Sequence, residues 1–247
     1  MKTLLSIFLL AITSFYAFSQ NTISKSYPLK PGQQVELRFD YPKLIKISSW
    51  DKNEVAIVAT LLTDDHAAPD AFTLKDSLDQ NSFIISNKID WNKVPTKYYR
   101  VEKGVKTSFE TKQDFDNYKK ENSENSQNAS YYQQRNLDVQ MEIKIPNGVF
   151  ADIKSTYGMI ELANFNNPAN IEAKYGGIDA SMSESQIGKI KLTNRYGKIY
   201  SNLTLTPTDQ KDTNFFTSIT AEPGKGPAYE LSSYYGNIYL RKPNNNK

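Results

Sequence analysis

The sequence contains no cysteine and a single histidine, His66, among its 247 residues. Without cysteine, the chain can form no disulfide, iron–sulfur cluster or thiolate-ligated zinc site, and it has no thiol nucleophile. One histidine excludes a multi-histidine metal centre and leaves one imidazole as a candidate base. The formal net charge is only +3, so composition gives no support to long-range attraction of nucleic acid. We therefore expect no cofactor, no metal and no enzymatic activity.

Long apolar runs are also scarce, and the main one lies at the N-terminus. Lys2 precedes an almost uncharged apolar stretch over residues 4–18, and the small residues Ala17 and Ser19 stand just before a cut at Gln20. This is the pattern of a secretory signal peptide over residues 1–19. No later stretch approaches the ~18 apolar residues that a membrane helix needs. We expect an exported mature chain without a transmembrane helix, in the periplasm or at the cell surface.

Helical patterns are nearly absent, whereas apolar and polar residues alternate in many segments. The cleanest run is Leu137, Val139, Met141, Ile143 and Ile145, each separated by a polar residue. This spacing places one face of a strand on a core and the other in water. The sequence therefore predicts an all-β fold.

Residues 106–136 break this pattern, because they contain no valine, isoleucine, leucine or methionine. Asn, Gln, Ser, Lys and Glu dominate, with a few aromatic residues such as Phe115 and Tyr131. A segment of this composition buries too little apolar surface to offset its ordering entropy. We expect a long polar surface insertion between two β strands that is partly disordered, with a short helix over residues 114–121 as an option. A tyrosine-bearing binding loop is the alternative.

A repeat of about twenty residues fills the C-terminal half of the chain. Each copy has a Tyr-Gly pair, an aliphatic residue four positions before the tyrosine and an isoleucine three positions after it. The last two tyrosines are 39 residues apart, which predicts a degenerate copy between them. The repeat residues are Tyr157, Gly158, Ile160, Tyr175, Gly176, Ile178, Tyr196, Gly197, Ile199, Phe216, Ile219, Tyr235, Gly236 and Ile238.

A repeat this short and without a helix is typical of a single-stranded β-solenoid, in which each coil pairs in parallel with the next. The isoleucines would then form an inner row and the aromatic residues a second row. Two geometries remain open. A bend or bulge at the glycine, using its freedom to adopt a positive φ, would keep both sets inward. Alternatively, the strand is straight and the tyrosines point outward. An antiparallel sandwich competes, but its hairpins would not predict such side-chain identity.

The Tyr-Gly-x-Ile coils, introduced by Ile145-Pro146-Asn147-Gly148, resemble adhesin-like bacterial β-solenoid domains of unknown function. These are relatives of the head-GIN and auto-transporter adhesin domains of Bacteroidetes. The segment from Trp50 to Val55 is similar to the opening Trp-Asp-Lys-x-Glu-Val strand pair of that family. The resemblance implies a right-handed solenoid exported to the cell envelope, with no established catalytic residues.

These observations divide the chain into five parts. We expect a signal peptide (1–19), N-terminal β strands that form the first coils or a cap (20–105), the polar insertion (106–136), β-solenoid coils (137–243) and a tail (244–247).

Three functions are compatible with this organisation. The leading hypothesis is a non-enzymatic binding module whose partner is a glycan, an envelope polymer or a protein. The second is a polysaccharide-active enzyme that uses Glu161, Asp179 and Lys198 on one outer face. The third is a structural envelope component that assembles through a solenoid end at residues 238–240, the other end being capped by residues 35–61.

Two further groups of residues have both a functional and a structural interpretation. Asp64-Asp65-His66 falls short of a metal or acid–base site, and we expect it to be a solvated loop. The tyrosine row would be a sugar-stacking surface if it faced outward, but we favour a structural row that seals a solenoid corner. Tyr200, Tyr234 and Tyr239 should alternate to another face, where exposed tyrosines would suit a binding surface.

Overall fold

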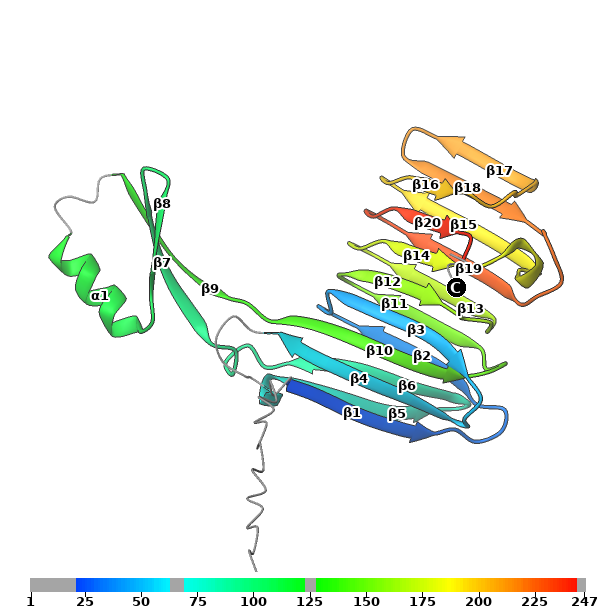
Figure 1. Cartoon of the computed structure of the whole chain (residues 1–247), viewed down its shortest axis with the longest axis horizontal. Helices are drawn as coiled ribbons and strands as arrows, with labels where there is room; N and C mark the ends of the chain where they lie inside the picture. The colour runs from blue at the N-terminus through cyan, green and yellow to red at the C-terminus, as the bar shows by residue number, and fades with distance from the viewer. Residues whose placement is uncertain (1–20, 63–68, 123–127, 244–247) are drawn as a thin grey trace, which may run out of the picture.

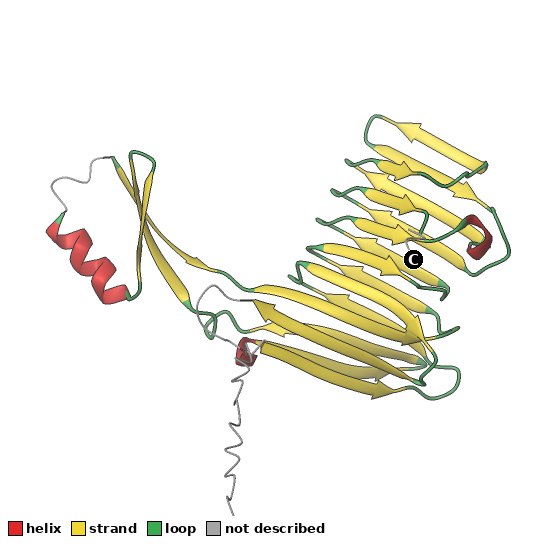
Figure 2. Ribbon diagram, in the orientation of Figure 1, coloured by secondary structure: helices red, strands yellow, loops and turns green. Residues whose placement is uncertain are grey.

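A computed structural model describes residues 21–62, 69–122 and 128–243. Two large β-sheets face each other across one apolar core, and a small third sheet with a helix projects from them as an arm (Figures 1 and 2). The all-β fold class predicted from alternation is confirmed. Alternating residues of the strands point into the core, as the buried positions of β10 (Asp138–Pro146) illustrate.

The two large sheets contain both parallel and antiparallel neighbours. Sheet A contains, in spatial order, β1 (Asn21–Pro28), β4 (Glu54–Leu62), β10, β3 (Leu44–Trp50), β12 (Met159–Ala163), β14 (Ile178–Ser181), β20 (Ile238–Arg241) and β16 (Ile199–Ser201). Sheet B contains β17 (Pro207–Thr213), β18 (Phe216–Ala221), β15 (Lys189–Arg195), β19 (Ala228–Ser233), β13 (Ala169–Ala173), β11 (Ala151–Ser155), β2 (Gln34–Phe39), β6 (Ser82–Ile89) and β5 (Phe72–Asp79). Two short 3₁₀ turns, η1 (Pro69–Ala71) and η3 (Glu184–Gln186), lie in the connections.

Five coils form the centre of the molecule. Each coil is a strand of sheet B, a tight corner and a strand of sheet A, namely β2–β3, β11–β12, β13–β14, β15–β16 and β19–β20. Neighbouring coils pair in parallel and in register, so equivalent apolar side chains stack in rows. The row in sheet A is Ile45, Ile160, Ile178, Ile238 and Ile199, and the row in sheet B is Leu37, Ile153, Ile171, Leu231 and Leu192.

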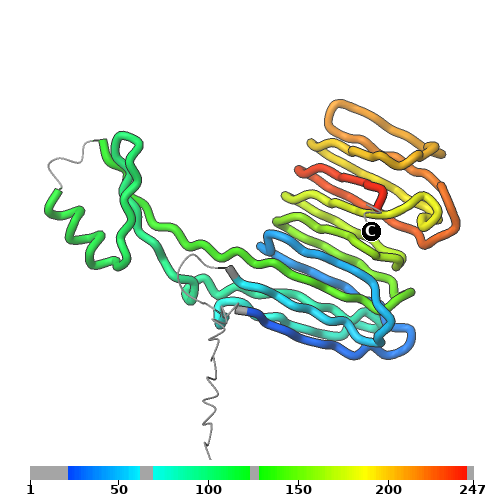
Figure 3. The backbone as a smooth tube through the Cα atoms, in the orientation of Figure 1, coloured from blue at the N-terminus to red at the C-terminus, as the bar shows by residue number. Residues whose placement is uncertain are grey.

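The coils do not stack in the order of the sequence. The last coil, β19–β20, lies between β13–β14 and β15–β16 in both sheets, and its red trace in Figure 3 runs between yellow-green and yellow neighbours. The regular solenoid expected from the repeat is therefore not confirmed. The chain leaves a gap of one coil after β14 and fills it only at its C-terminus.

The predicted degenerate copy at Phe216 and Ile219 does not form a coil. These residues lie in β18, which pairs antiparallel with β15 and with β17. Ile219 stands opposite Leu192 of sheet B and does not join the isoleucine row of sheet A. The 39-residue spacing arises because a β-hairpin, and not a further coil, separates the last two copies.

The two ends of the stack differ from the expected ones. The segment over residues 238–240 is not an open end, because β20 lies between β14 and β16 and Ile238 and Leu240 are fully buried. The outermost strands on that side are β16 and β17. On the opposite side, β4 and β10 pair antiparallel and β1 lies outside them, while β5 and β6 complete sheet B.

The arm is formed by the polar insertion and the residues before it. It consists of β7 (Thr96–Glu102), β8 (Val105–Phe109) and β9 (Ala129–Arg135), with α1 (Lys112–Glu121) packed beside them. The described part of the insertion thus forms strands and a helix, and α1 includes the short helix that was considered. Ring contacts replace an aliphatic core: Phe115 lies 5.3 Å from Tyr98, 5.6 Å from Phe109 and 5.8 Å from Tyr131 between ring centroids.

Candidate functional site

The most distinctive surface is a row of five exposed tyrosines at the corners of the coils. We call Tyr41, Tyr157, Tyr175, Tyr235 and Tyr196, in this spatial order, the tyrosine ladder. Successive ring centroids are 5.1–5.2 Å apart, and the ring planes differ by 20°, 16°, 10° and 7° along the row. The side chains are 42–61% exposed. The corners lie along the side of the stack from which the arm projects (Figure 1).

The corners combine both geometries that the sequence left open. The chain bends at each Tyr-Gly pair, so the aliphatic residues before and after the bend both face the core; all of them are buried except Ile199, which is half-buried. The tyrosine at the bend nevertheless points to solvent. In the second coil, for example, Ile153 and Ile160 are fully buried while Tyr157 is 42% exposed. The ladder therefore lies at the surface of the corners, outside the apolar core.

Glycine is required at these corners because neighbouring backbones approach closely. A Cβ atom on Gly176 would lie 1.6 Å from the carbonyl oxygen of Gly158, and one on Gly236 would lie 2.0 Å from that of Gly176. Gly197 stands in the same relation to Gly236, at 2.1 Å. Among these four glycines only Gly158 has a positive φ, of 93°. Close stacking, more than backbone conformation, thus explains the glycine of the repeat.

Small polar side chains two positions before the tyrosines hold the corners in place. Asn194 donates to the carbonyl of Gly236 at 2.8 Å and accepts from the amide of Gly197 at 2.8 Å. Ser233 donates to the carbonyl of Gly176 at 3.0 Å and accepts from the amide of Gly236. Both side chains are buried, so these bonds satisfy corner groups that water does not reach. The ring positions are therefore fixed by the backbone beneath them.

Stacking determines which part of each ring a ligand can reach. Each interior tyrosine has a neighbouring ring on both faces, at 5.1–5.2 Å. The two end rings are covered as well: Trp91 meets Tyr41 edge-on at 5.4 Å, and Phe215 lies 5.7 Å from Tyr196. A sugar therefore cannot stack flat on an interior ring. The ladder presents ring edges and phenol hydroxyls instead.

The hydroxyls of the ladder are free for a ligand. Within residues 21–62, 69–122 and 128–243, none of the five ladder hydroxyls has a protein hydrogen-bond partner. The tyrosine OH groups that do have partners lie elsewhere, as in Tyr229, which donates to the carbonyl of Phe165 at 3.2 Å. A phenol hydroxyl can both donate and accept.

Sequence reasoning missed three aromatic residues of this surface. Tyr41 is followed by proline and its corner is one residue longer, since Ile45, four positions later, pairs with Ile160. The signal that could have found it is the spacing of Leu37, Phe39 and Tyr41, which matches the positions before each Tyr-Gly pair. Trp91 and Phe215 do not occupy the tyrosine position of the repeat, so the repeat gave no signal for them. Phe215, and not the expected Phe216, contacts Tyr196.

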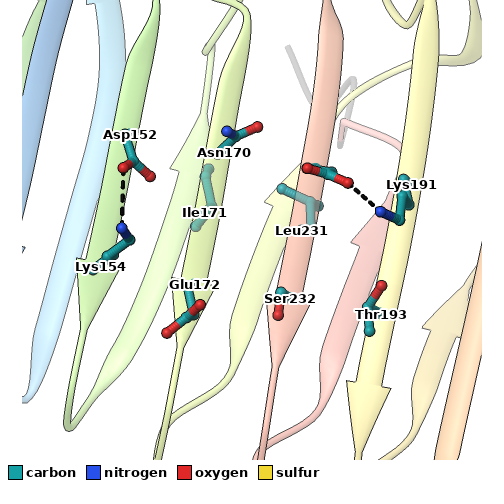
Figure 4. A pocket seen from close by; sticks show the side chains of 10 residues that line it. Asp152, Lys154, Asn170, Ile171, Glu172, Lys191, Thr193, Leu231 and Ser232 are labelled. Atoms are coloured by element: carbon teal, nitrogen blue, oxygen red, sulfur yellow. Dashed lines mark hydrogen bonds and ion pairs between the residues drawn. The ribbon is translucent and has the colours of Figure 1, made fainter.

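A second candidate surface is a shallow depression of about 320 Å³ on the outer face of sheet B (Figure 4). Its charged side chains are largely paired with each other: Lys154 with Asp152 at 3.2 Å, and Lys191 with Glu230. Ile171 and Leu231 lie beneath them in the core rows. Paired charges of both signs on an open sheet face are typical of a solvated surface, so this depression offers little specific chemistry.

Only two of the three proposed catalytic residues lie together. Glu161 and Asp179 are neighbours across β12 and β14, but Asp179 pairs with Arg241 at 3.1 Å. Lys198 lies in a corner, two positions after Tyr196, and is not equivalent to the two acids. The equivalent positions in the next coils are Tyr239 and Tyr200.

Tyr239 and Tyr200 stack on each other at 5.3 Å on the outer face of sheet A. Tyr234 lies under the guanidinium of Arg195, 5.8 Å from it. Residues 64–66 lie outside the described residues. Within the described ranges, no three histidine or acidic side chains gather into a group that could hold a metal ion.

Comparison with known proteins gives two distant likenesses. No family model and no curated protein matches the chain. A crystal structure described as a "putative cell adhesion protein" from Clostridium sporogenes is 10% identical, covers 90% of this chain and all of that chain, and has a TM-score of 0.45. A "putative adhesin" from Bacteroides fragilis is 9% identical, covers 90% of this chain and 97% of its own, and has a TM-score of 0.21. Since both scores are below 0.5, neither likeness carries an argument about function.

Proposed function

We propose that this protein is an exported, non-enzymatic, adhesin-like module of the cell envelope, which binds an external partner through the tyrosine ladder. The observation that carries the proposal is the row of five stacked and exposed rings, whose hydroxyls have no hydrogen-bond partner among the described residues. Exposed tyrosines are favoured at binding surfaces because they offer a large contact area and a polar group at a small entropic cost. Single exposed tyrosines are common on protein surfaces, whereas five in one line form a continuous surface.

Rigidity supports a binding role. Backbone hydrogen bonds continue from coil to coil through the corners: the amide of Tyr175 donates to the carbonyl of Thr156 at 2.9 Å, and that of Tyr235 donates to Lys174 at 3.0 Å. The rings are therefore ordered before any partner arrives. A preordered surface loses less conformational entropy on binding than a flexible loop does.

Export is proposed from the N-terminal segment of the sequence. The signal-peptide pattern over residues 1–19 is the observation that supports it. In the part of the chain that the structure describes, no helix is long and apolar enough to cross a membrane. Protease treatment of intact cells, beside a periplasmic control protein, tests the compartment. Cleavage of this protein while the control survives places it at the cell surface; survival until the outer membrane is opened, followed by cleavage, places it in the periplasm.

The binding role is tested with ladder variants. The purified protein is mixed with insoluble cell-envelope and extracellular-matrix fractions, and saturable retention is measured. The triple variant Tyr157→Ser, Tyr175→Ser, Tyr235→Ser should lose most of this retention. The matched control is Tyr200→Ser with Tyr239→Ser, which removes the stacked pair on the outer face of sheet A. Equal retention of the ladder variant and the wild type, with both folded by circular dichroism, contradicts the proposal.

A further inference from the structure

The tyrosine ladder presents hydroxyl groups at a regular interval. Four successive steps of 5.1–5.2 Å separate the five rings, and the planes stay within 20° of each other. The row extends over roughly 20 Å, because neighbouring strands of a sheet lie about 4.8 Å apart. A ligand that uses all five hydroxyls must itself be extended and must repeat its polar groups at the same interval.

An extended β-1,4-linked glycan meets this requirement. Successive sugars of such a chain advance by nearly the distance between neighbouring ladder rings, and each sugar carries hydroxyls at its edges. An α-1,4-linked glycan curves and does not keep this alignment. We propose that the tyrosine ladder binds one extended strand of a β-1,4-linked glycan, with one sugar beside each ring. This inference rests on the proposed binding function and names the class of its ligand.

The charge of the surface fits an uncharged polymer. All five ladder side chains are neutral phenols, and two nearby cations have contacts of their own: Lys43 pairs with Asp138 at 2.9 Å, and the Lys174 ammonium lies 5.2 Å from the ring centroid of Tyr175. The ladder itself therefore offers no charge to bind an anionic chain. Ring edges and hydroxyls would contact the edges of the sugars, since the ring faces are covered by their neighbours.

The geometry predicts a characteristic dependence on ligand length. A single solvent-exposed hydrogen bond contributes little, so each added sugar should strengthen binding by about threefold to tenfold. The gain should stop when the oligosaccharide spans the five rings. Cello-oligosaccharides and chito-oligosaccharides of two to six sugars, titrated by calorimetry or by NMR shift changes, measure this dependence. Both series have the β-1,4 linkage, so a difference in affinity between them shows whether the ladder prefers a glucan or an N-acetylated glycan.

Phenylalanine variants separate recognition from stacking. Tyr157→Phe with Tyr175→Phe and Tyr235→Phe keeps the rings but removes three hydroxyls, so affinity should fall at least tenfold while the melting temperature stays the same. Tyr200→Phe with Tyr239→Phe is the matched control and should bind as the wild type does. Malto-oligosaccharides are the linkage control and should not bind.

Two results overturn the inference: affinity that does not rise with length up to about five sugars, and binding that the phenylalanine variants leave unchanged. If oligosaccharides fail but envelope material is still retained by the wild type and lost in the serine variant, only the glycan assignment fails. If the serine variant also retains envelope material, the proposed function fails as well.

Discussion

At the scale of single residues, each corner depends on the absence of one side chain and the presence of another. The glycine allows two backbones to approach, while the tyrosine beside it is held outside the core. The sequence makes the two look like one motif, but they have separate roles. The glycine is needed for the coils to stack, and the tyrosine forms part of the exposed surface.

Gly176→Ala should destabilise the protein strongly. The added Cβ would lie 1.6 Å from the backbone oxygen of Gly158, and that oxygen cannot move without separating two coils. We expect a loss of about 3 kcal/mol in the free energy of unfolding, at the upper end of typical overpacking costs. Denaturant unfolding measures it. Gly104→Ala is the control: its Cβ would meet no atom within 4 Å, and only its positive φ of 81° opposes it, at a cost of about 1 kcal/mol.

Glu184 should make stability sensitive to acid. The amide of Thr204 and the ammonium of Lys242 each donate to this carboxylate at 2.9 Å, and these hydrogen bonds, the backbone bond first, lower its pKa from 4.5 to about 2. Because the folded pKa is the lower one, the stabilisation is complete above pH 4.5 and is lost as pH falls through about 2.

The variant Glu184→Gln isolates this contribution. Its melting temperature should lie below that of the wild type near neutral pH, and the two curves should converge as pH falls from 4.5 toward 2. Thermal melts followed by circular dichroism provide the measurement. Curves that stay parallel across this range would show that the carboxylate does not provide the acid sensitivity.

At the scale of elements, the arm shows where composition misleads. Aliphatic residues are missing from residues 106–136, yet Phe109, Phe115 and Tyr118 pack together and Lys106 lies 3.8 Å above the ring of Tyr99. Aromatic and cation–π contacts can order a small unit without an aliphatic core. These contacts follow neither the strand nor the helix spacing of apolar residues, so the alternation pattern used to find strands does not detect them.

Removing the arm should leave the two-sheet body folded. Thr96 and Arg135 are direct partners across β7 and β9, so a short Gly-Ser linker can join Pro95 to Asn136. Since the aromatic cluster of the arm is separate from the main core, we expect a cooperative melt within a few degrees of the wild type. Loss of that melt would show that the arm is needed for the body to fold.

The rows within the coils could be predicted from sequence, whereas the order of the coils could not. Position-specific identity fixes which residues share a row, as with Ile160 and Ile178. The same identity makes every coil an acceptable neighbour for every other coil, because each offers the same aliphatic surface and the same parallel edge. Only the 39-residue interval before Tyr235 indicated an irregular connection. The sequence did not show that this interval contains a hairpin, or that the coil after it lies between two earlier coils.

At the scale of the whole molecule, the last coil completes the stack from within. Truncation after Gly226 would remove β19 and β20 and would open a gap between β13–β14 and β15–β16. Two cut faces, lined by rows such as Ile171 and Leu192, would then be exposed. We expect the truncated protein to lose its cooperative thermal transition.

The matched deletion removes the β17–β18 hairpin at the edge of sheet B. Pro207 and Ala221 are direct partners, so a short linker can replace residues 207–221. This variant should still melt cooperatively, at a lower temperature. If the C-terminal truncation melts as sharply as this control does, the last coil is not needed to hold the others together.

The position of this coil has a consequence for how the protein acquires its structure. A ribosome or a translocation channel delivers the chain from its N-terminus, and in a simple solenoid each new coil could settle on the finished edge of the previous one. Here the position between β13–β14 and β15–β16 stays vacant until β19 and β20 have emerged, after the β17–β18 hairpin. The core between these coils therefore stays incomplete until that segment has been delivered, even though the outermost coil, β15–β16, has emerged before it.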